Sequence, residues 1–91
     1  MTDADPGPAP QDGEAAEVEV DATGLRCPLP IIRLAAAAKV APAGTVITLT
    51  STDPAAEPDV AAWCRMRGHT LLTQTWSTTT PRTLTSRTKL R

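Results

Sequence analysis

The sequence predicts an α/β two-layer sandwich, built in the order β-α-β-α-β-β, with a mixed four-stranded sheet and two helices on one face. Three observations predict this fold. Twice along the chain a strand-like pattern of side chains gives way to the apolar spacing of a helix. Two threonine-rich segments, residues 69–76 and 82–90, are separated by a turn sequence, which is typical of a hairpin. With 91 residues the chain has room for a single small core.

The first strand and the first helix follow from the pattern of residues 16–40. Residues 16–22 alternate apolar and acidic side chains, which indicates a half-buried strand. From Pro28 to Val40 the period changes, and Ile31, Leu34 and Ala38 fall on one stripe of a helix. A β-α-β crossover of this kind predicts that the first two strands are parallel.

The second strand and the second helix occupy residues 45–67. Residues 45–50 are rich in β-branched side chains and have turn residues on both sides, which favours a strand. Asp53 is a good N-cap, but Pro58 would interrupt a helix that was already running, so we expect an irregular turn first. The regular helix should then span residues 58–67 and end at Gly68 in the left-handed conformation.

The N-terminal segment differs from the rest of the chain in composition. Residues 1–13 contain three prolines, two glycines and three aspartates and lack large aliphatic side chains, which predicts a disordered acidic tail before a domain at residues 14–91. The first residues resemble no signal peptide, and no apolar run approaches the roughly 20 residues that span a bilayer. We therefore expect a soluble cytoplasmic protein in which Cys27 and Cys64 are free thiols.

Cys27 is the candidate functional residue. It lies between the first strand and the first helix, at the carboxyl end of the strand. Functional residues of α/β crossovers usually lie at this end of the strands. With Pro28 as the first helical residue, Cys27 becomes the N-cap, where the helix dipole stabilises a thiolate, and Arg26 could lower its pKa further. Pro28 and Pro30 should stiffen this junction without breaking a hydrogen bond, because first-turn N–H groups have no intrahelical partner. A buried cysteine that caps a helix by accident is the alternative.

Other chemistries find less support in the sequence. Cys64 falls on the predicted core stripe of the second helix, so we expect it to fill the core. Cys27, Cys64 and His69 lack the paired spacing of a zinc site, and a proline stands where a C-x-x-C redox motif needs its second cysteine. The C-terminal part is basic, but two tryptophans, with no tyrosine or phenylalanine, argue against direct RNA binding.

Two motifs carry a resemblance to a known family. The stretch from Val20 to Leu72, above all VDATGLRCPLPIIRL and STDPAAEPDVAAWC, resembles the TusA/SirA-like sulfur-carrier family of small bacterial proteins. Its G-x-R-C-P-x-P motif is matched in full, by Gly24, Arg26, Cys27, Pro28 and Pro30. A second signature of the family is met by Asp53, Pro54, Asp59, Val60, Trp63 and Cys64.

The resemblance implies a sulfurtransferase that works as a persulfide relay. Cys27 would accept sulfane sulfur from a donor protein, of the cysteine desulfurase or rhodanese type, and pass it to an acceptor protein, with no bound cofactor. Family routes end in tRNA 2-thiolation, molybdenum cofactor assembly or other sulfur metabolism. Arg65 and Arg67 are candidates for contacts with acidic residues of the donor. A regulatory or partner-binding module that keeps the fold but moves no sulfur is the alternative.

Overall fold

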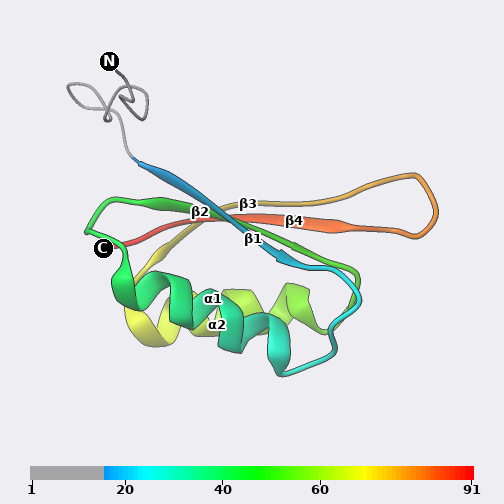
Figure 1. The fold of residues 1–91 in the computed structure, drawn as a ribbon, viewed down its shortest axis with the longest axis horizontal. Helices are drawn as coiled ribbons and strands as arrows, with labels where there is room; N and C mark the ends of the chain where they lie inside the picture. The colour runs from blue at the N-terminus through cyan, green and yellow to red at the C-terminus, as the bar shows by residue number, and fades with distance from the viewer. Residues whose placement is uncertain (1–15) are drawn as a thin grey trace, which may run out of the picture.

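The structure, a computed structural model, describes residues 16–91. The predicted tail, residues 1–13, lies outside the described residues, as do the next two residues. The elements follow the predicted order β-α-β-α-β-β (Figure 1). They are β1 (Glu17–Ala22), α1 (Leu29–Val40), β2 (Val46–Ser51), α2 (Ala56–Arg67), β3 (Thr70–Trp76) and β4 (Leu84–Lys89).

The four strands form one mixed sheet in the order β1-β2-β4-β3. β1 and β2 are parallel, as the β-α-β pattern predicts, and they pair from Glu17 with Val46 to Ala22 with Ser51. β4 lies between β2 and β3 and is antiparallel to both. The carboxyl ends of β1 and β2 therefore lie at the same edge of the sheet, and the segments that follow them are neighbours in space.

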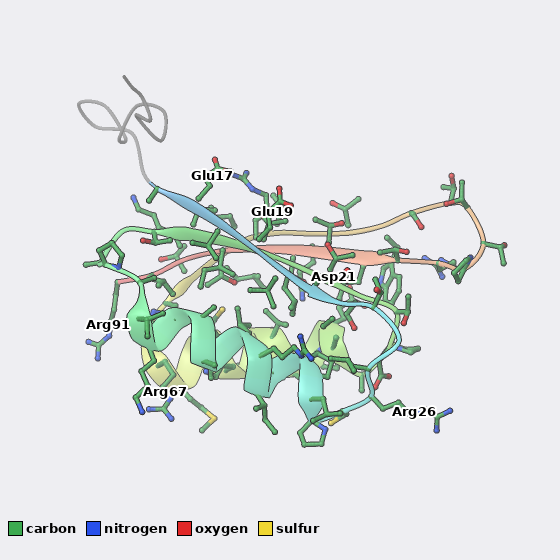
Figure 2. All side chains as sticks on the ribbon, viewed as in Figure 1. Glu17, Glu19, Asp21, Arg26, Arg67 and Arg91 are labelled. Atoms are coloured by element: carbon green, nitrogen blue, oxygen red, sulfur yellow. The ribbon has the colours of Figure 1, made fainter. Side chains whose placement is uncertain are left out.

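Both helices cover one face of the sheet, and within residues 16–91 the other face is open, which confirms the predicted two-layer sandwich (Figure 1). The covered face contributes fully buried side chains from β2 and β4, among them Ile47 and Leu84. On the open face, Figure 2 shows Glu17 and Glu19 of β1 directed away from the helices. Glu17 and Arg87 form an ion pair of 3.6 Å there, a surface contact of the kind that adds little stability.

α1 packs its predicted apolar stripe on the sheet. Leu34 is fully buried, and Ile31, Ala35 and Ala38 pack against the same core. The helix begins at Leu29, with Pro28 as its N-cap residue, one position later than the sequence pattern predicts. This displacement moves Cys27 out of the N-cap position, which matters for the site.

α2 begins earlier than predicted, at Ala56. The expected start at Pro58 was wrong because this proline is the third helical residue, where the backbone nitrogen has no intrahelical partner to lose. An irregular turn does precede the helix, since the Asp53 carboxylate accepts the Ala55 N–H at 3.0 Å. The helix ends as expected at Gly68, whose φ of 75° is in the left-handed region.

The β3–β4 hairpin extends past the ends of the helices (Figure 1). Its strands are shorter than the predicted segments, because the His69 N–H still bonds the Cys64 carbonyl of α2 at 2.9 Å and Thr83 bonds Ser77 across the turn. At the end of β3, directly before the hairpin turn, Trp76 Nε1 donates to a carboxylate oxygen of Glu57 at 3.1 Å. Glu57 thus joins the start of α2 to the sheet.

His69 is expected to make folding sensitive to pH. Its Nδ1 accepts the Arg91 N–H at 3.2 Å, and its pKa is lowered by burial and by the charges of Arg91 and Arg67. As the pH falls through the ordinary histidine pKa of about 6.5, the unfolded chain takes up a proton that the folded chain does not, so stability is present above that pH and is lost below it.

We expect His69→Gln to reduce this pH dependence, because glutamine can still accept the Arg91 N–H but does not titrate. Thermal melts at about pH 8 and about pH 5.5 should show a fall in Tm of roughly a few degrees in the wild type and a smaller one in the variant. Equal falls in both proteins would assign the effect to other groups.

Candidate functional site

The candidate site is formed where the β1–α1 and β2–α2 connections meet. Their contact begins at Gly24, whose N–H donates to Thr52 Oγ1 at 2.9 Å and whose φ of 80° favours glycine. Between the two connections lies an open cavity of about 520 Å³. It is lined by Gly24, Leu25, Arg26, Thr52, Asp53 and Pro54.

Two carboxylates from the β2–α2 segment hold Cys27. The Cys27 backbone N–H donates to Asp53 Oδ2 at 2.7 Å, and its sulfur donates to Asp59 Oδ2 at 3.0 Å. Asp53 precedes α2 and Asp59 is in its first turn, and both are half-buried, whereas Cys27 is exposed. The thiol is therefore accessible to another protein but has a defined partner within its own chain.

The prediction that the first helix activates Cys27 is wrong. The pKa of the thiol is raised, first by the hydrogen bond to Asp59, then by desolvation and by the negative charges of Asp59 and Asp53. Pro28, not Cys27, is the N-cap residue of α1, and among the residues that the structure describes no side chain forms a cap hydrogen bond with that helix. Because the sulfur bonds a carboxylate instead of the free N–H groups of α1, the protonated thiol is the favoured form.

Arg26 does not act on the thiol as predicted. Its side chain is exposed, and Figure 2 shows it at the edge of the molecule, extending away from the helices. Its charge instead helps to lower the pKa of Asp53, together with the N–H groups of Ala55 and Cys27, which are the larger causes. Asp53 is thus held as a carboxylate, the form that accepts the Cys27 N–H.

Pro28 and Pro30 lie as their predicted structural role requires. Pro30 is the second residue of α1 and is buried, and Pro28 precedes the helix and is exposed. Neither position has an intrahelical partner for a backbone N–H, so no hydrogen bond is lost. The Pro28 carbonyl accepts the N–H groups of Ile31 and Ile32, at 3.1 Å and 3.0 Å, which joins the motif directly to the helix.

The second cysteine has the predicted core position. Cys64 is buried among the residues that α2 presents to the sheet, and its sulfur lies 3.5 Å from Thr88 Oγ1. The two cysteines and His69 form no metal site, since within residues 16–91 no group of three or more suitable side chains could hold a metal ion. Cys27 is therefore the accessible thiol of the described chain.

Asp53 and Asp59 are the site residues that the sequence interpretation did not place beside Cys27. Both belong to the second family signature, yet they lie 26 and 32 positions from the cysteine. A usable signal was present. Parallel strands joined by a helix bring their carboxyl ends to one edge, so polar residues that follow both strands meet there.

Arg65 and Arg67 lie far from this site. They are in the last turn of α2, and Asp59 is in the first. At 1.5 Å per residue, Asp59 and Arg67 are separated by about 12 Å along the helix. Figure 2 places Arg26 and Arg67 at opposite ends of the molecule. A partner that approaches Cys27 first meets the first turns of the helices, and a contact of Arg65 and Arg67 with acidic residues of the donor stays a prediction.

The fold and the site together define a small α/β protein with an exposed cysteine on the connection after its first strand. Within the described residues, no helix is both long and apolar enough to cross a membrane. The family model described as "Sulfurtransferase TusA" matches residues 18–80, which is more than two thirds of the chain. The chain belongs to the TusA sulfurtransferase family.

Individual relatives agree with this assignment. The chain is 47% identical over 53 residues to "Putative sulfur carrier protein NMA0882" of Neisseria meningitidis, covering 58% of this chain and 72% of the relative. It is 38% identical over 55 residues to sulfur carrier protein TusA of Pseudomonas putida strain W619, covering 60% and 69%. With TusA of Pseudomonas syringae pv. syringae it shares 32% identity over 65 residues, covering 71% and 77%.

Proposed function

We propose that this protein is a sulfur carrier that holds sulfane sulfur as a persulfide on Cys27. The observation that carries the proposal is the position of Cys27: it is the exposed cysteine of the family motif, on a connection tied by hydrogen bonds to Thr52 and Asp53. Relatives named sulfur carrier proteins support the same role. A sulfur that passes between proteins must be accessible, and a rigid mounting lowers the ordering cost of docking.

The chemistry is an exchange between a thiol and a persulfide. Once Cys27 has lost its proton, its sulfur attacks the outer sulfur of the donor persulfide, because the thiolate is the nucleophile. A bond forms from Cys27 to the outer sulfur as the S–S bond of the donor breaks, and the donor thiolate takes up a proton. One thiol and one persulfide give one persulfide and one thiol, so the step needs no external oxidant, reductant or bound cofactor.

The partners are a donor and an acceptor protein. A cysteine desulfurase or a rhodanese-type protein would supply the persulfide in the cytoplasm, and the acceptor would pass the sulfur toward tRNA 2-thiolation, molybdenum cofactor assembly or another branch of sulfur metabolism. Exposed apolar side chains in the first turn of α1, which follows the cysteine, favour protein docking there: Leu29 and Ile32 are 46% and 55% exposed.

Intact mass spectrometry tests the proposal. The protein is incubated with a cysteine desulfurase and cysteine, and its mass is measured before and after treatment with a reductant. We expect a gain of about 32 Da, one sulfur atom, that the reductant removes. If a desulfurase, a rhodanese and a chemical persulfide donor all fail to produce this gain, the carrier role is wrong and a partner-binding module remains.

A further inference from the structure

The contact between Cys27 and Asp59 is not needed to hold the motif in place. The backbone of the motif is already fixed, because Gly24 and Cys27 donate their N–H groups to Thr52 and Asp53. Asp59 instead contacts the sulfur itself, the atom that would carry the cargo, at 3.0 Å. An accessible thiol meant only to be reactive gains nothing from a carboxylate at this distance, since negative charge disfavours the thiolate.

We propose that Asp59 is a positioning residue that keeps Cys27 protonated and directed toward α2 while the protein carries no sulfur. The benefit of this protonated thiol to a sulfur carrier rests on the proposed function, whereas the hydrogen bond between Cys27 and Asp59 is independent of it. The exposed thiol of the free protein would then react slowly with small oxidants and alkylating agents, because these reagents react with the thiolate. The carboxylate therefore suppresses formation of the nucleophilic thiolate.

The charges around the sulfur favour the protonated thiol. Asp59 on α2 and Asp53 before α2 both raise the pKa of Cys27, with the hydrogen bond to Asp59 as the first cause. On the β1–α1 connection, the positive charge of Arg26 acts on Asp53. Asp53 contacts the backbone nitrogen of Cys27, so Asp59 is the carboxylate with a direct hydrogen bond to the sulfur.

The hydrogen bond to Asp59 also distinguishes the sulfur-free protein from the protein that carries a persulfide. In a persulfide, Sγ is bonded to the second sulfur and carries no proton, so it has nothing to donate to Asp59 Oδ2. The bond between Sγ and Asp59 therefore belongs to the sulfur-free protein. Addition of a sulfur to Cys27 removes this bond. The bonds of the motif's backbone N–H groups to Thr52 and Asp53 keep the same donors and acceptors.

The test is the pH profile of Cys27 alkylation by iodoacetamide in wild type, Asp59→Asn and Glu57→Gln, followed at the Cys27 peptide by mass spectrometry. Asparagine keeps the shape of aspartate but lacks its charge, so the profile should move to lower pH. The rate at about pH 7.5 should rise about three- to tenfold, since a larger thiolate fraction outweighs its weaker nucleophilicity.

Glu57→Gln is the matched control. It removes one negative charge from the same turn of α2, but Glu57 bonds Trp76 and not Cys27, and glutamine can still accept that bond. The control should keep the wild-type profile. If Asp59→Asn fails to fold by circular dichroism, Asp59→Ala replaces it, because alanine also lacks the charge and has the highest helix propensity.

An unchanged profile in the folded Asp59 variant, or an equal shift in Glu57→Gln, would overturn the proposal. The assay involves no sulfur transfer. Failure to load sulfur therefore leaves this inference intact, and an unchanged profile leaves the proposed carrier role intact.

Discussion

Cys27→Ser is expected to abolish persulfide loading: the mass gain of about 32 Da that we expect for the wild type should fall to background. A serine hydroxyl has nearly the shape of the thiol and can still donate to Asp59, which lies 3.0 Å from the sulfur. It cannot form a persulfide. Because Cys27 is exposed, the substitution has little effect on packing, and thermal melts should give nearly the wild-type Tm.

Cys64→Ser provides the control for this result. Cys64 is buried beside Thr88, whose hydroxyl can hydrogen-bond to serine, so the variant should fold with some loss of stability. Its buried position leaves Cys27 as the thiol that meets a donor, and the mass gain should be retained. If Cys64→Ser lost the gain and Cys27→Ser kept it, the carrier residue would be Cys64 and the proposed site would be wrong.

The element order could be predicted because each element has a local signal. The alternation of residues 16–22 and the stripe around Leu34 depend on side-chain spacing alone, and the structure confirms both. Gly68 ends α2 because few other residues adopt its backbone conformation. The position of β4 between β2 and β3 could not be predicted, because strand order depends on pairing between distant segments, which no local pattern specifies.

The candidate site was predicted in part. The sequence singles out Cys27 through its place after a strand and through the motif, but it assigns the wrong electrostatic partner. That error came from the helix boundary: with α1 starting at Leu29, Cys27 precedes the N-cap. Placing Asp59 beside the sulfur also requires the start of α2 two residues before Pro58 and a contact across 32 positions of sequence.

Leu34→Ala is expected to produce the largest loss of stability. Leu34 is fully buried between α1 and the sheet. Because a domain of this size has a single small core, no other contacts compensate for the loss of this side chain. Removing a buried leucine side chain costs about 2–5 kcal/mol, the lost transfer free energy plus that of the cavity. In a domain of this size, about 1 kcal/mol lowers Tm by roughly 4–8 °C, so a fall of at least about 8 °C should appear.

Ile32→Ala, in the same helix, separates burial from helix propensity. Ile32 is 55% exposed, so its truncation should change the free energy of unfolding by about 0.5 kcal/mol or less. Both variants can be unfolded in urea and followed by tryptophan fluorescence, to which Trp76 contributes together with Trp63, which packs in the same core as Leu34. Similar losses in the two variants would mean that α1 does not pack on the sheet through Leu34. The helix that follows Cys27 would then have a different arrangement on the sheet.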